Sequence, residues 1–494
     1  MSALSLLLHD YVVVPREAHR PPHLPAGVQF VLDTIEGHSH EFKLAGHTKK
    51  QCAKAGARLS AWVEAVESFI KHPAPSSRLD GALLLRATLQ HMDVAAFEPS
   101  VALLALLTRL CVKPSRAHTT RAVGAECLGS LLALGCRSSA SARSACVGIL
   151  DKGLVTSLLH TMSEQGGDHG GVLTAAVATA QALSLAMEVV PSLLRPFAAR
   201  VTRTCVSLMD SPHDLLADAA ARLLVSTTFA AGDRAPALLL ESVACVEKLV
   251  TLAMPQLLDS STAFETASGT AHGKHGSPPV LELSPLACEE ALVLRRFQRL
   301  CGLITALLCP DMSAPTPIVV PVSRLLAFVE ALLDVPFMSS SQARGMVADD
   351  ADCLPALAID TILPHLHVAV LHILTAVLQV TGPRILPQSR HVARLLGAAV
   401  SIATGDPKVF TGKRQNRASV VCNIRTPATM AAVRAGIQAL GPGCAGIVAA
   451  PVLPRLLHVL RLLRQDIREQ AEGANDPSAR VRRSCVRRCL FVGW

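Results

Sequence analysis

Aromatic side chains are scarce in this chain. Phe, Trp and Tyr together make up 3% of the residues, and there is a single Tyr. Strands favour aromatic and β-branched residues, whereas the apolar half of this sequence consists mainly of Leu, Ala and Val, of which Leu and Ala favour helices. The shortage of Tyr and Trp also argues against a platform on which bases stack. The composition therefore predicts an all-α protein.

Signatures of catalysis and of export are also missing. The sequence has no G-x-x-x-x-G-K-[ST] phosphate loop, no G-x-G-x-x-G after a strand, no G-x-S-x-G elbow and no H-E-x-x-H. The first ten residues lack a basic segment, and their apolar run is too short for a signal peptide. We expect a chain that is not an enzyme, has no catalytic residue and no cofactor, and resides in the cytoplasm or nucleus.

The 15 cysteines are scattered and include no Cys-x-x-Cys pair. Small buried thiols in a reducing compartment explain this distribution best. Cys485 and Cys489 have the i, i+4 spacing that suits metal ligation on a helix, but no second pair and no nearby histidine completes a zinc site. We therefore expect no metal at this position.

The tightest histidine group is His365, His367 and His372. On a helix, His365 and His367 point about 200° apart, so they cannot hold one ion there. We therefore expect these three histidines to be ordinary packing or surface residues that bind no metal.

Two stretches, 172–194 and 354–381, are apolar enough to resemble membrane spans. A bilayer span needs about 20 mostly apolar residues, and polar groups within it are costly. Gln181 and Glu188 interrupt the first stretch and Asp360 the second. We predict buried helices of a soluble repeat protein and no membrane contact.

The chain carries 47 Lys and Arg against 38 Asp and Glu, a formal net charge of +9. This excess is compatible with an acidic partner such as RNA but does not establish one. Short basic runs are typical of import signals, nucleic-acid contacts or merely solvated surface, and all three readings stay open here. The residues are Lys413, Arg414 and Arg417 in a predicted loop, and Arg480, Arg482, Arg483, Arg487 and Arg488 in the tail.

Apolar residues recur at helical spacing in segment after segment. One set comprises Leu59, Trp62, Val63, Val66, Phe69 and Ile70. Helices of about 12–20 residues with short polar turns suggest stacked pairs, and armadillo and HEAT units run about 40–47 residues. No crisp sequence repeat has that period. The expected fold is an armadillo/HEAT-like helical-repeat solenoid with degenerate repeats.

Composition divides the chain into five segments. Residues 1–54 form a partly disordered extension, and 55–258 form the first helical-repeat half. Residues 259–284, rich in Ser, Thr, Gly and His, form a flexible linker, because such a composition cannot support a packed core. Residues 285–465 form the second half, and 466–494 form a basic tail.

The order of segments resembles a known family. Residues 58–91 place a helix, a small polar turn and an Arg-Leu-x-Gly-Ala-x-Leu-Leu helix in succession, through Arg78, Leu79, Gly81, Ala82, Leu84 and Leu85. This is similar to the opening of the pre-rRNA-processing Rix-one family, also called the proline-, glutamic acid- and leucine-rich protein (PELP) family. Residues 172–225, 317–335 and 363–396 resemble later helices of that family, so the resemblance spans about 55–465. The long acidic tail of the animal members is absent, and interactions made through it are not expected here.

The resemblance implies a non-catalytic scaffold of a nuclear complex, in the nucleolus or nucleoplasm, for large (60S) ribosomal subunit biogenesis and for processing of internal transcribed spacer 2. It implies as partners a WD-repeat subunit, an armadillo-type subunit, the AAA ATPase midasin and the pre-60S particle, with a possible homodimer and no small-molecule substrate. Contact with rRNA is expected to be indirect rather than direct. The alternative is a generic armadillo/HEAT adaptor in nuclear transport or kinase-complex assembly. Importin-like adaptors carry Trp-Asn ladders, whereas this chain has only Trp62 and Trp494.

Overall fold

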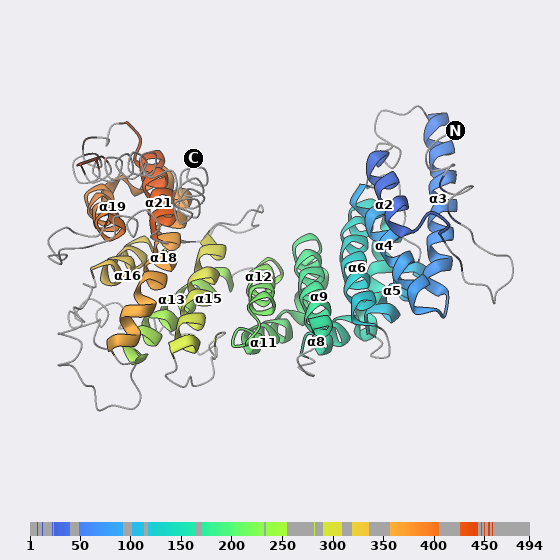
Figure 1. Cartoon of the computed structure of the whole chain (residues 1–494), viewed down its shortest axis with the longest axis horizontal. Coiled ribbons are helices and arrows are strands. Elements are labelled where there is room, and N and C mark those ends of the chain that lie inside the picture. Colours follow the sequence, from blue (N-terminus) through green and yellow to red (C-terminus); the bar gives the residue numbers. More distant parts are fainter. Residues whose placement is uncertain are drawn as a thin grey trace, which may run out of the picture. The chain divides into compact units, whose positions relative to one another are not determined.

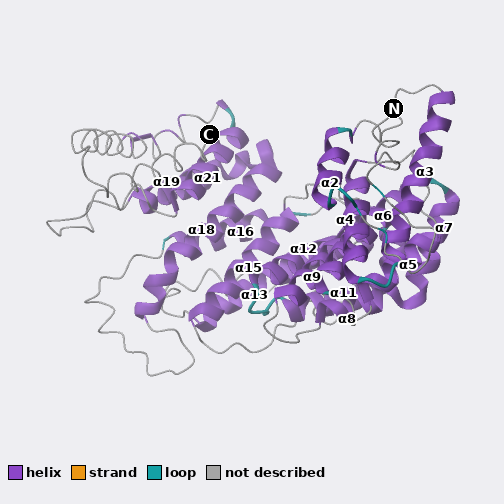
Figure 2. Cartoon of the chain, turned by 45° about the vertical axis from the view of Figure 1, so that its right-hand side comes forward, coloured by secondary structure: helices purple, strands orange, loops and turns teal. Residues whose placement is uncertain are grey.

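The fold is helical throughout the part of the chain that the computed structural model describes (Figure 2). No strand occurs among those residues, so the predicted all-α class is confirmed. Contacts divide the chain into two units, Met1–Gly232 and Asp233–Trp494, and each is considered by itself. Besides a few single residues, the described ranges are 24–39, 49–91, 101–112, 117–163, 170–231, 234–253, 290–308, 319–334, 356–404 and 425–442.

The helices of the first unit form two rows. In the first row α4, α6, α9 and α12 pack side by side, and in the second row α3, α5, α8 and α11 follow one another (Figure 1). Each first-row helix also contacts second-row helices, as in stacked helical pairs. The elements are α2 (Val28–Gly37), α3 (Lys49–Lys71), α4 (Pro75–His91), α5 (Val101–Val112), α6 (His118–Ser138), α7 (Ala140–Ile149), the π-turn η4 (Leu150–Leu154), α8 (Val155–Ser163), α9 (Gly170–Val189), α10 (Pro191–Leu194), the 3-10 turn η5 (Arg195–Phe197), α11 (Ala198–Leu208) and α12 (Asp214–Ala231).

The spacing of the first-row helices gives the repeat length. They begin at Pro75, His118, Gly170 and Asp214, so one repeat occupies about 43 to 52 residues. Armadillo and HEAT units of about 40–47 residues are close to this length. The predicted helical-repeat solenoid is therefore what the first unit forms.

The second unit repeats the arrangement with longer connections. Helices α15, α18 and α21 pack in one row, and α13, α16 and α19 pair with them respectively (Figure 1). The elements are α13 (Arg234–Ala253), α15 (Glu290–Leu308), α16 (Val322–Leu333), α18 (Ala356–Thr381), the 3-10 turn η7 (Gly382–Gln388), α19 (Ser389–Thr404) and α21 (Arg425–Leu440).

The unit boundary lies before the linker that composition predicts. The division falls between Gly232 and Asp233, so α13 belongs to the second unit. Within the predicted linker 259–284, only Leu281 is described, and its backbone N–H donates to Glu241 of α13 at 3.0 Å. The predicted extension 1–54 contains helix α2 and the start of α3. The predicted segment limits themselves stay predictions.

The apolar faces predicted from helical spacing lie in the core. Trp62 is fully buried, and its indole N–H donates to Thr88 Oγ1 at 2.9 Å, which ties α3 to α4. Leu84 in the first unit and Leu326 in the second are also fully buried. A buried indole N–H needs an acceptor, and the Thr88 hydroxyl oxygen supplies it. The same hydroxyl donates its proton to Leu84 O within α4, so both of its roles are satisfied.

Two described stretches, Gly170–Val189 and Ile362–Ala403, are long and apolar enough to cross a membrane by length and composition alone. In their most apolar windows, half and about two thirds of the residues respectively are buried inside the protein. Helix α9 packs against α6 and α12, and α18 packs against α15 and α21. Packing between repeats accounts for their apolar character, in agreement with the buried helices predicted from the sequence.

The starts of the first-row helices α4 and α6 share a sequence motif that helical periodicity alone does not show. Residues 76–82 read Ser-Ser-Arg-Leu-Asp-Gly-Ala, and 119–125 read Thr-Thr-Arg-Ala-Val-Gly-Ala, both at the start of a first-row helix. A Cβ on Gly81 would lie 2.7 Å from Phe69 Cβ, and one on Gly124 would lie 3.4 Å from Cys111 Sγ. Glycine at 81 thus lets α4 approach the end of α3 more closely than alanine would allow, whereas a Cβ at 124 would make an ordinary contact with the end of α5.

Helices α6 and α9 approach each other closely at another glycine. A Cβ on Gly129 would lie 2.8 Å from Ala182 Cα, a backbone atom that no side-chain rotation can move. Small residues on both sides therefore set the distance between these two first-row helices.

Alanine substitutions at two helical glycines, Gly129 and Gly148, should change the free energy of unfolding in opposite directions. Gly129→Ala should lower the free energy of unfolding by about 1–3 kcal/mol, because α6 and α9 must move apart. Gly148→Ala, where no atom lies within 4 Å of the added Cβ, should raise it by about 0.5–1 kcal/mol through helix propensity. Urea unfolding of the full-length variants measures both. Equal shifts of the same sign would contradict the assigned packing.

Most described cysteines are buried thiols. Cys111, Cys127, Cys136, Cys146, Cys205 and Cys301 are buried, and Cys245 is half-buried. Burial raises the pKa of Cys111 to about 12, although the neighbouring Arg121 guanidinium opposes the rise. Burial also raises the pKa of Cys205 and of Cys301.

Alkylation should therefore be slow at these thiols in the folded chain. The thiolate is the reactive form, and near pH 8 it is a small fraction when the pKa is raised. We expect Cys111, Cys205 and Cys301 to stay unlabelled by iodoacetamide until urea unfolds the chain, as read by mass spectrometry of their peptides. Labelling of Cys205 at the same rate with and without urea would contradict the burial.

Candidate interaction surface

The structure gives no metal cluster among the described residues: no three His, Cys, Asp or Glu side chains come together there. His365 is exposed, whereas His367 is fully buried with its Nε2 3.0 Å from Leu332 O of α16. The two rings thus point to different surroundings, as helical geometry predicts. Partial burial lowers the pKa of His372 below its usual range, although this residue keeps contact with solvent. The three histidines contribute to packing and to surface.

The other residues singled out from the sequence lie outside the described part. These are Cys485 and Cys489, Lys413, Arg414 and Arg417 of the predicted loop, and Arg480, Arg482, Arg483, Arg487 and Arg488 of the tail. Their import, RNA-contact and solvated-surface readings stay open.

A buried arginine connects three helices of the first unit. The Arg121 guanidinium, on α6, donates to Cys111 O at the end of α5 at 3.0 Å and to Thr161 Oγ1 of α8 at 3.1 Å. Arginine can serve several acceptors at once because its donors are fixed in a planar fork. Arg121 therefore fixes the relative positions of two successive second-row helices. Arg121 occupies the same position in its repeat as Arg78 in the preceding one, and this match in the sequence could have identified it.

Second-row helices of the first unit and the elements next to them in sequence carry exposed arginines. We define the arginine row as Arg109 of α5, Arg143 of α7, Arg195 of η5, and Arg200 and Arg203 of α11; all five are exposed. Helices α5, α8 and α11 are neighbours, and α7 packs against α5. Helices α5, α7, α8, α10 and α11 and the turn η5 contain no Asp or Glu, and η4 adds one Asp and one Lys. The surface of this row is therefore cationic over several consecutive elements.

Local structure explains how two of these arginines come to face outward. In α11 the buried positions include Val201, Cys205 and Leu208, while Arg200 and Arg203 lie one turn apart on the opposite side. Arg200 also donates to Thr156 Oγ1 of α8 at 2.8 Å, which leaves its remaining donors available. The guanidinium is thus held in place between two helices.

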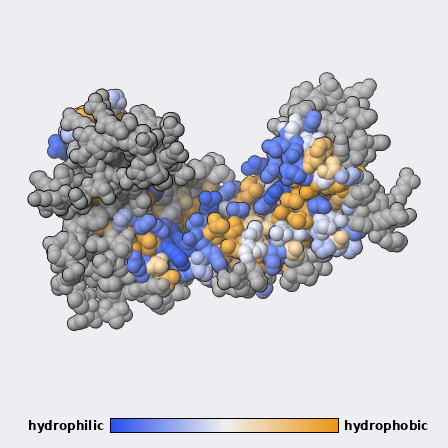
Figure 3. Space-filling model, in the orientation of Figure 1, coloured by the Kyte–Doolittle hydropathy of each residue, from blue (hydrophilic) through white to orange (hydrophobic). Residues whose placement is uncertain are grey.

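Large apolar side chains do not accompany the arginine row. In the described part of the first unit, the exposed large hydrophobic residues are Phe30 of α2 and Leu215 of α12, neither of which belongs to that row. On the face shown in Figure 3, hydrophobic and hydrophilic groups alternate along the first unit.

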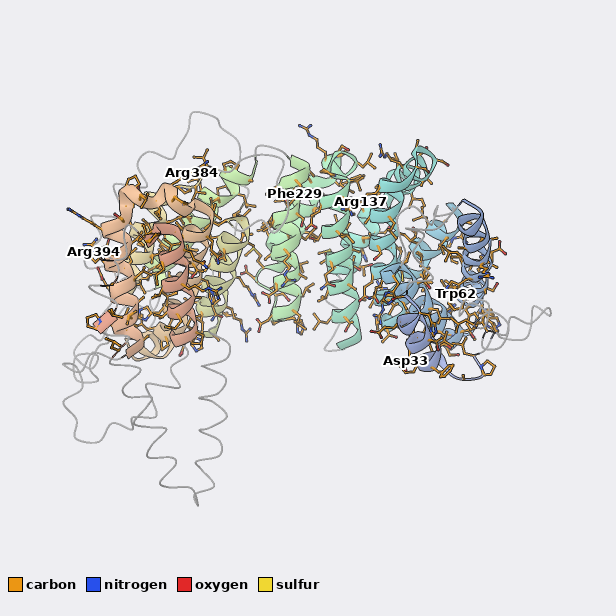
Figure 4. All side chains as sticks on the ribbon, turned by 90° about the horizontal axis from the view of Figure 1, so that it is seen from above. Asp33, Trp62, Arg137, Phe229, Arg384 and Arg394 are labelled. Atoms are coloured by element: carbon orange, nitrogen blue, oxygen red, sulfur yellow. The ribbon has the colours of Figure 1, made fainter. Side chains whose placement is uncertain are left out.

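The second unit has a surface of a different kind. Val380 of α18, Leu386 of η7 and Ile437 of α21 are exposed by 43%, 43% and 55%, on three elements that contact one another. Arg384 belongs to the same turn, and Figure 4 shows it at the periphery of this unit. Here arginine and apolar side chains are mixed, in contrast to the arginine row.

Charged pairs join the helices of this unit. Both Arg324 Nε and Nη2 on α16 donate to the Glu247 carboxylate of α13, the first at 3.0 Å, and both side chains are nearly buried. Glu330, further along α16, pairs with Arg394 of α19 and lies 2.9 Å from His391 Nε2 of the same helix. The second row of this unit is therefore linked from α13 through α16 to α19.

The Glu247–Arg324 pair should show strong coupling in a double-mutant cycle. Each single variant, Glu247→Gln or Arg324→Gln, removes one charge of a nearly buried bidentate pair, and we expect a coupling energy of about 1–3 kcal/mol in unfolding measurements. The Glu67–Lys71 pair of α3, in which the Lys71 side chain is 56% exposed, provides the comparison, with an expected coupling of about 0.3–0.5 kcal/mol. Additive effects of the two substitutions at 247 and 324 would contradict the pairing.

Comparison with known proteins yields likenesses in structure. No protein-family model and no curated protein sequence matches the chain. A chain of the "Rix1-Rea1 pre-60S particle - Rix1-subcomplex" is similar with a TM-score of 0.54 and 15% identity, over 89% of this chain and 74% of that one. Importin beta is similar with a TM-score of 0.39 and 12% identity, over 94% of this chain and 51% of the importin chain. Kap121p bound to Nup53p is similar with a TM-score of 0.34 and 10% identity, over 94% of this chain and 51% of the Kap121p chain.

These comparisons differ in weight. The two transport-receptor likenesses are too loose to support an argument. The Rix1-subcomplex chain is the kind of protein that the sequence resemblance indicated, and the resemblance is confirmed at the level of the fold.

Proposed function

We propose that this chain is a non-catalytic scaffold subunit of a nuclear complex for large (60S) ribosomal subunit biogenesis, including processing of internal transcribed spacer 2 in pre-rRNA. The observation that supports this best is the fold shared over 89% of the chain with a component of the Rix1-Rea1 pre-60S particle. The order of sequence motifs in residues 58–91 and beyond supports the same family independently of that comparison.

The physical basis of a scaffold role is the large surface of stacked helical pairs. Each pair buries its apolar face against its neighbours, so the outer faces of successive helices stay available to several partners. We propose a WD-repeat subunit, an armadillo-type subunit, the AAA ATPase midasin and the pre-60S particle as partners, and a homodimer as a further assembly. The proposed location is the nucleus, in nucleolus or nucleoplasm.

Affinity purification of the tagged full-length chain from its own cells, followed by mass spectrometry, tests this function. We expect recovery of a WD-repeat protein, an armadillo-type partner, midasin and large-subunit precursor proteins. Recovery of nuclear pore proteins or kinases in their place would contradict the proposal and favour the transport or kinase-assembly adaptor.

Two aspartate substitutions near α16 provide matched controls for that experiment. Leu326→Asp places an unpaired charge in the core and should abolish recovery of partners, because the repeat unfolds. Val319→Asp adds the same charge at a side chain that is 79% exposed and should leave recovery unchanged.

A further inference from the structure

We propose that the arginine row of the first unit binds the phosphate backbone of double-helical RNA. This inference rests on the proposed function only for the source of that RNA, which would be pre-ribosomal. The binding chemistry itself follows from the five exposed arginines and from their surroundings.

The arrangement of the charges fits a polyanion that runs across the repeats. The elements that carry the arginines are linked by packing, since α7 contacts α5, α5 contacts α8 and α8 contacts α11. Packed helix axes lie about 8–10 Å apart, so a chain of phosphates can cross several of these elements. The guanidinium fork matches phosphate oxygens in a bidentate manner and stays charged at every physiological pH. Because these helices contain no Asp or Glu, a polyanion lying along them meets no repulsive charge from their side chains.

The composition of the surface favours nucleic acid over an acidic protein. The buried centre of a protein–protein interface is apolar, but no exposed large hydrophobic residue belongs to the described part of the arginine row. Phosphate contacts need no such centre, since they depend on charge and on released counterions. The surface around Leu386 in the second unit does expose large hydrophobic residues, so it serves as the comparison for the arginine row.

The same surface favours a double helix over a single strand. Single-stranded RNA is held by aromatic side chains on which its bases stack. In the elements of the arginine row and in α8, the described aromatic side chains are the half-buried Phe197 of η5 and the exposed His160 of α8, and neither Tyr nor Trp occurs there. Double-stranded RNA is recognised mostly through its shape, phosphates and 2′-hydroxyls, which arginines can contact without stacking.

Binding of the full-length chain to an RNA duplex of about 16–20 base pairs tests the inference, measured between about 50 and 200 mM salt. The triple variant Arg195→Gln/Arg200→Gln/Arg203→Gln removes three charges from η5 and α11. We expect its affinity at the middle of this salt range to fall by about tenfold or more, and the slope of log affinity against log salt to become shallower by about 2–3.

A matched variant separates this site from general basicity. Arg384→Gln/Arg390→Gln/Arg434→Gln removes the same number of charges from exposed positions of the second unit, and its duplex affinity should stay within about threefold of the unmodified chain. Both triple variants change only exposed side chains, so circular dichroism should show unchanged helix content and melting.

Three results would overturn the inference. The first is an unmodified chain that ignores the duplex at the lowest salt. The second is an equal loss of affinity in both triple variants. The third is binding of a poly-glutamate peptide, but not the duplex, with loss in the first variant, which would assign the row to an acidic protein. None of these affects recovery of the proposed protein partners, so failure of this inference and failure of the proposed function are distinguishable.

Discussion

The close approach of neighbouring helices at small residues is the constraint on which the first unit depends. Gly129 against Ala182 sets the distance between α6 and α9, and Gly81 lets α4 lie against the end of α3. At such distances each helix buries its apolar stripe against adjacent helices, and leucines such as Leu84 become fully buried. Since every repeat relies on the next in this way, stability is distributed along the array rather than held in one central core.

Outside these apolar contacts, the two units use their charged side chains differently. In the second unit, ion pairs through Glu247 and Glu330 connect α13, α16 and α19 to each other. In the first unit, α5, α7, η5 and α11 carry exposed arginines and no acidic residue, while the buried Arg121 of the first-row helix α6 connects α5 and α8. A chain with one cationic surface and one mixed surface can address partners of different chemistry at the same time.

Much of the fold could be predicted from the sequence because helix periodicity and core burial are local properties. The apolar spacing around Trp62 and the polar interruptions in 172–194 indicated buried helices, which is what these residues form. The opposed directions of His365 and His367 followed from helical geometry alone.

The candidate surface could not be predicted in the same way. Its arginines are spread from Arg109 to Arg203 in the sequence, and only the packing of α7 on α5, of α5 on α8 and of α8 on α11 brings together the elements that carry them. The contiguous basic runs, from which a basic surface can be predicted in a sequence, lie elsewhere, at Lys413–Arg417 and in the tail. The repeat through Arg78 and Arg121 was missed because only a few of its positions are constrained by packing, and the remaining ones vary freely.

Crosslinking of RNA to this protein in cells, with sequencing of the RNA and mass spectrometry of the crosslinked peptides, tests most directly whether the chain contacts pre-ribosomal RNA through the arginine row. The predicted result is enrichment of large-subunit precursor RNA, with crosslinks in peptides of η5 and α11 around Arg195–Arg203. Crosslinks to unrelated RNAs without enrichment of that precursor, or none in those peptides, would contradict it.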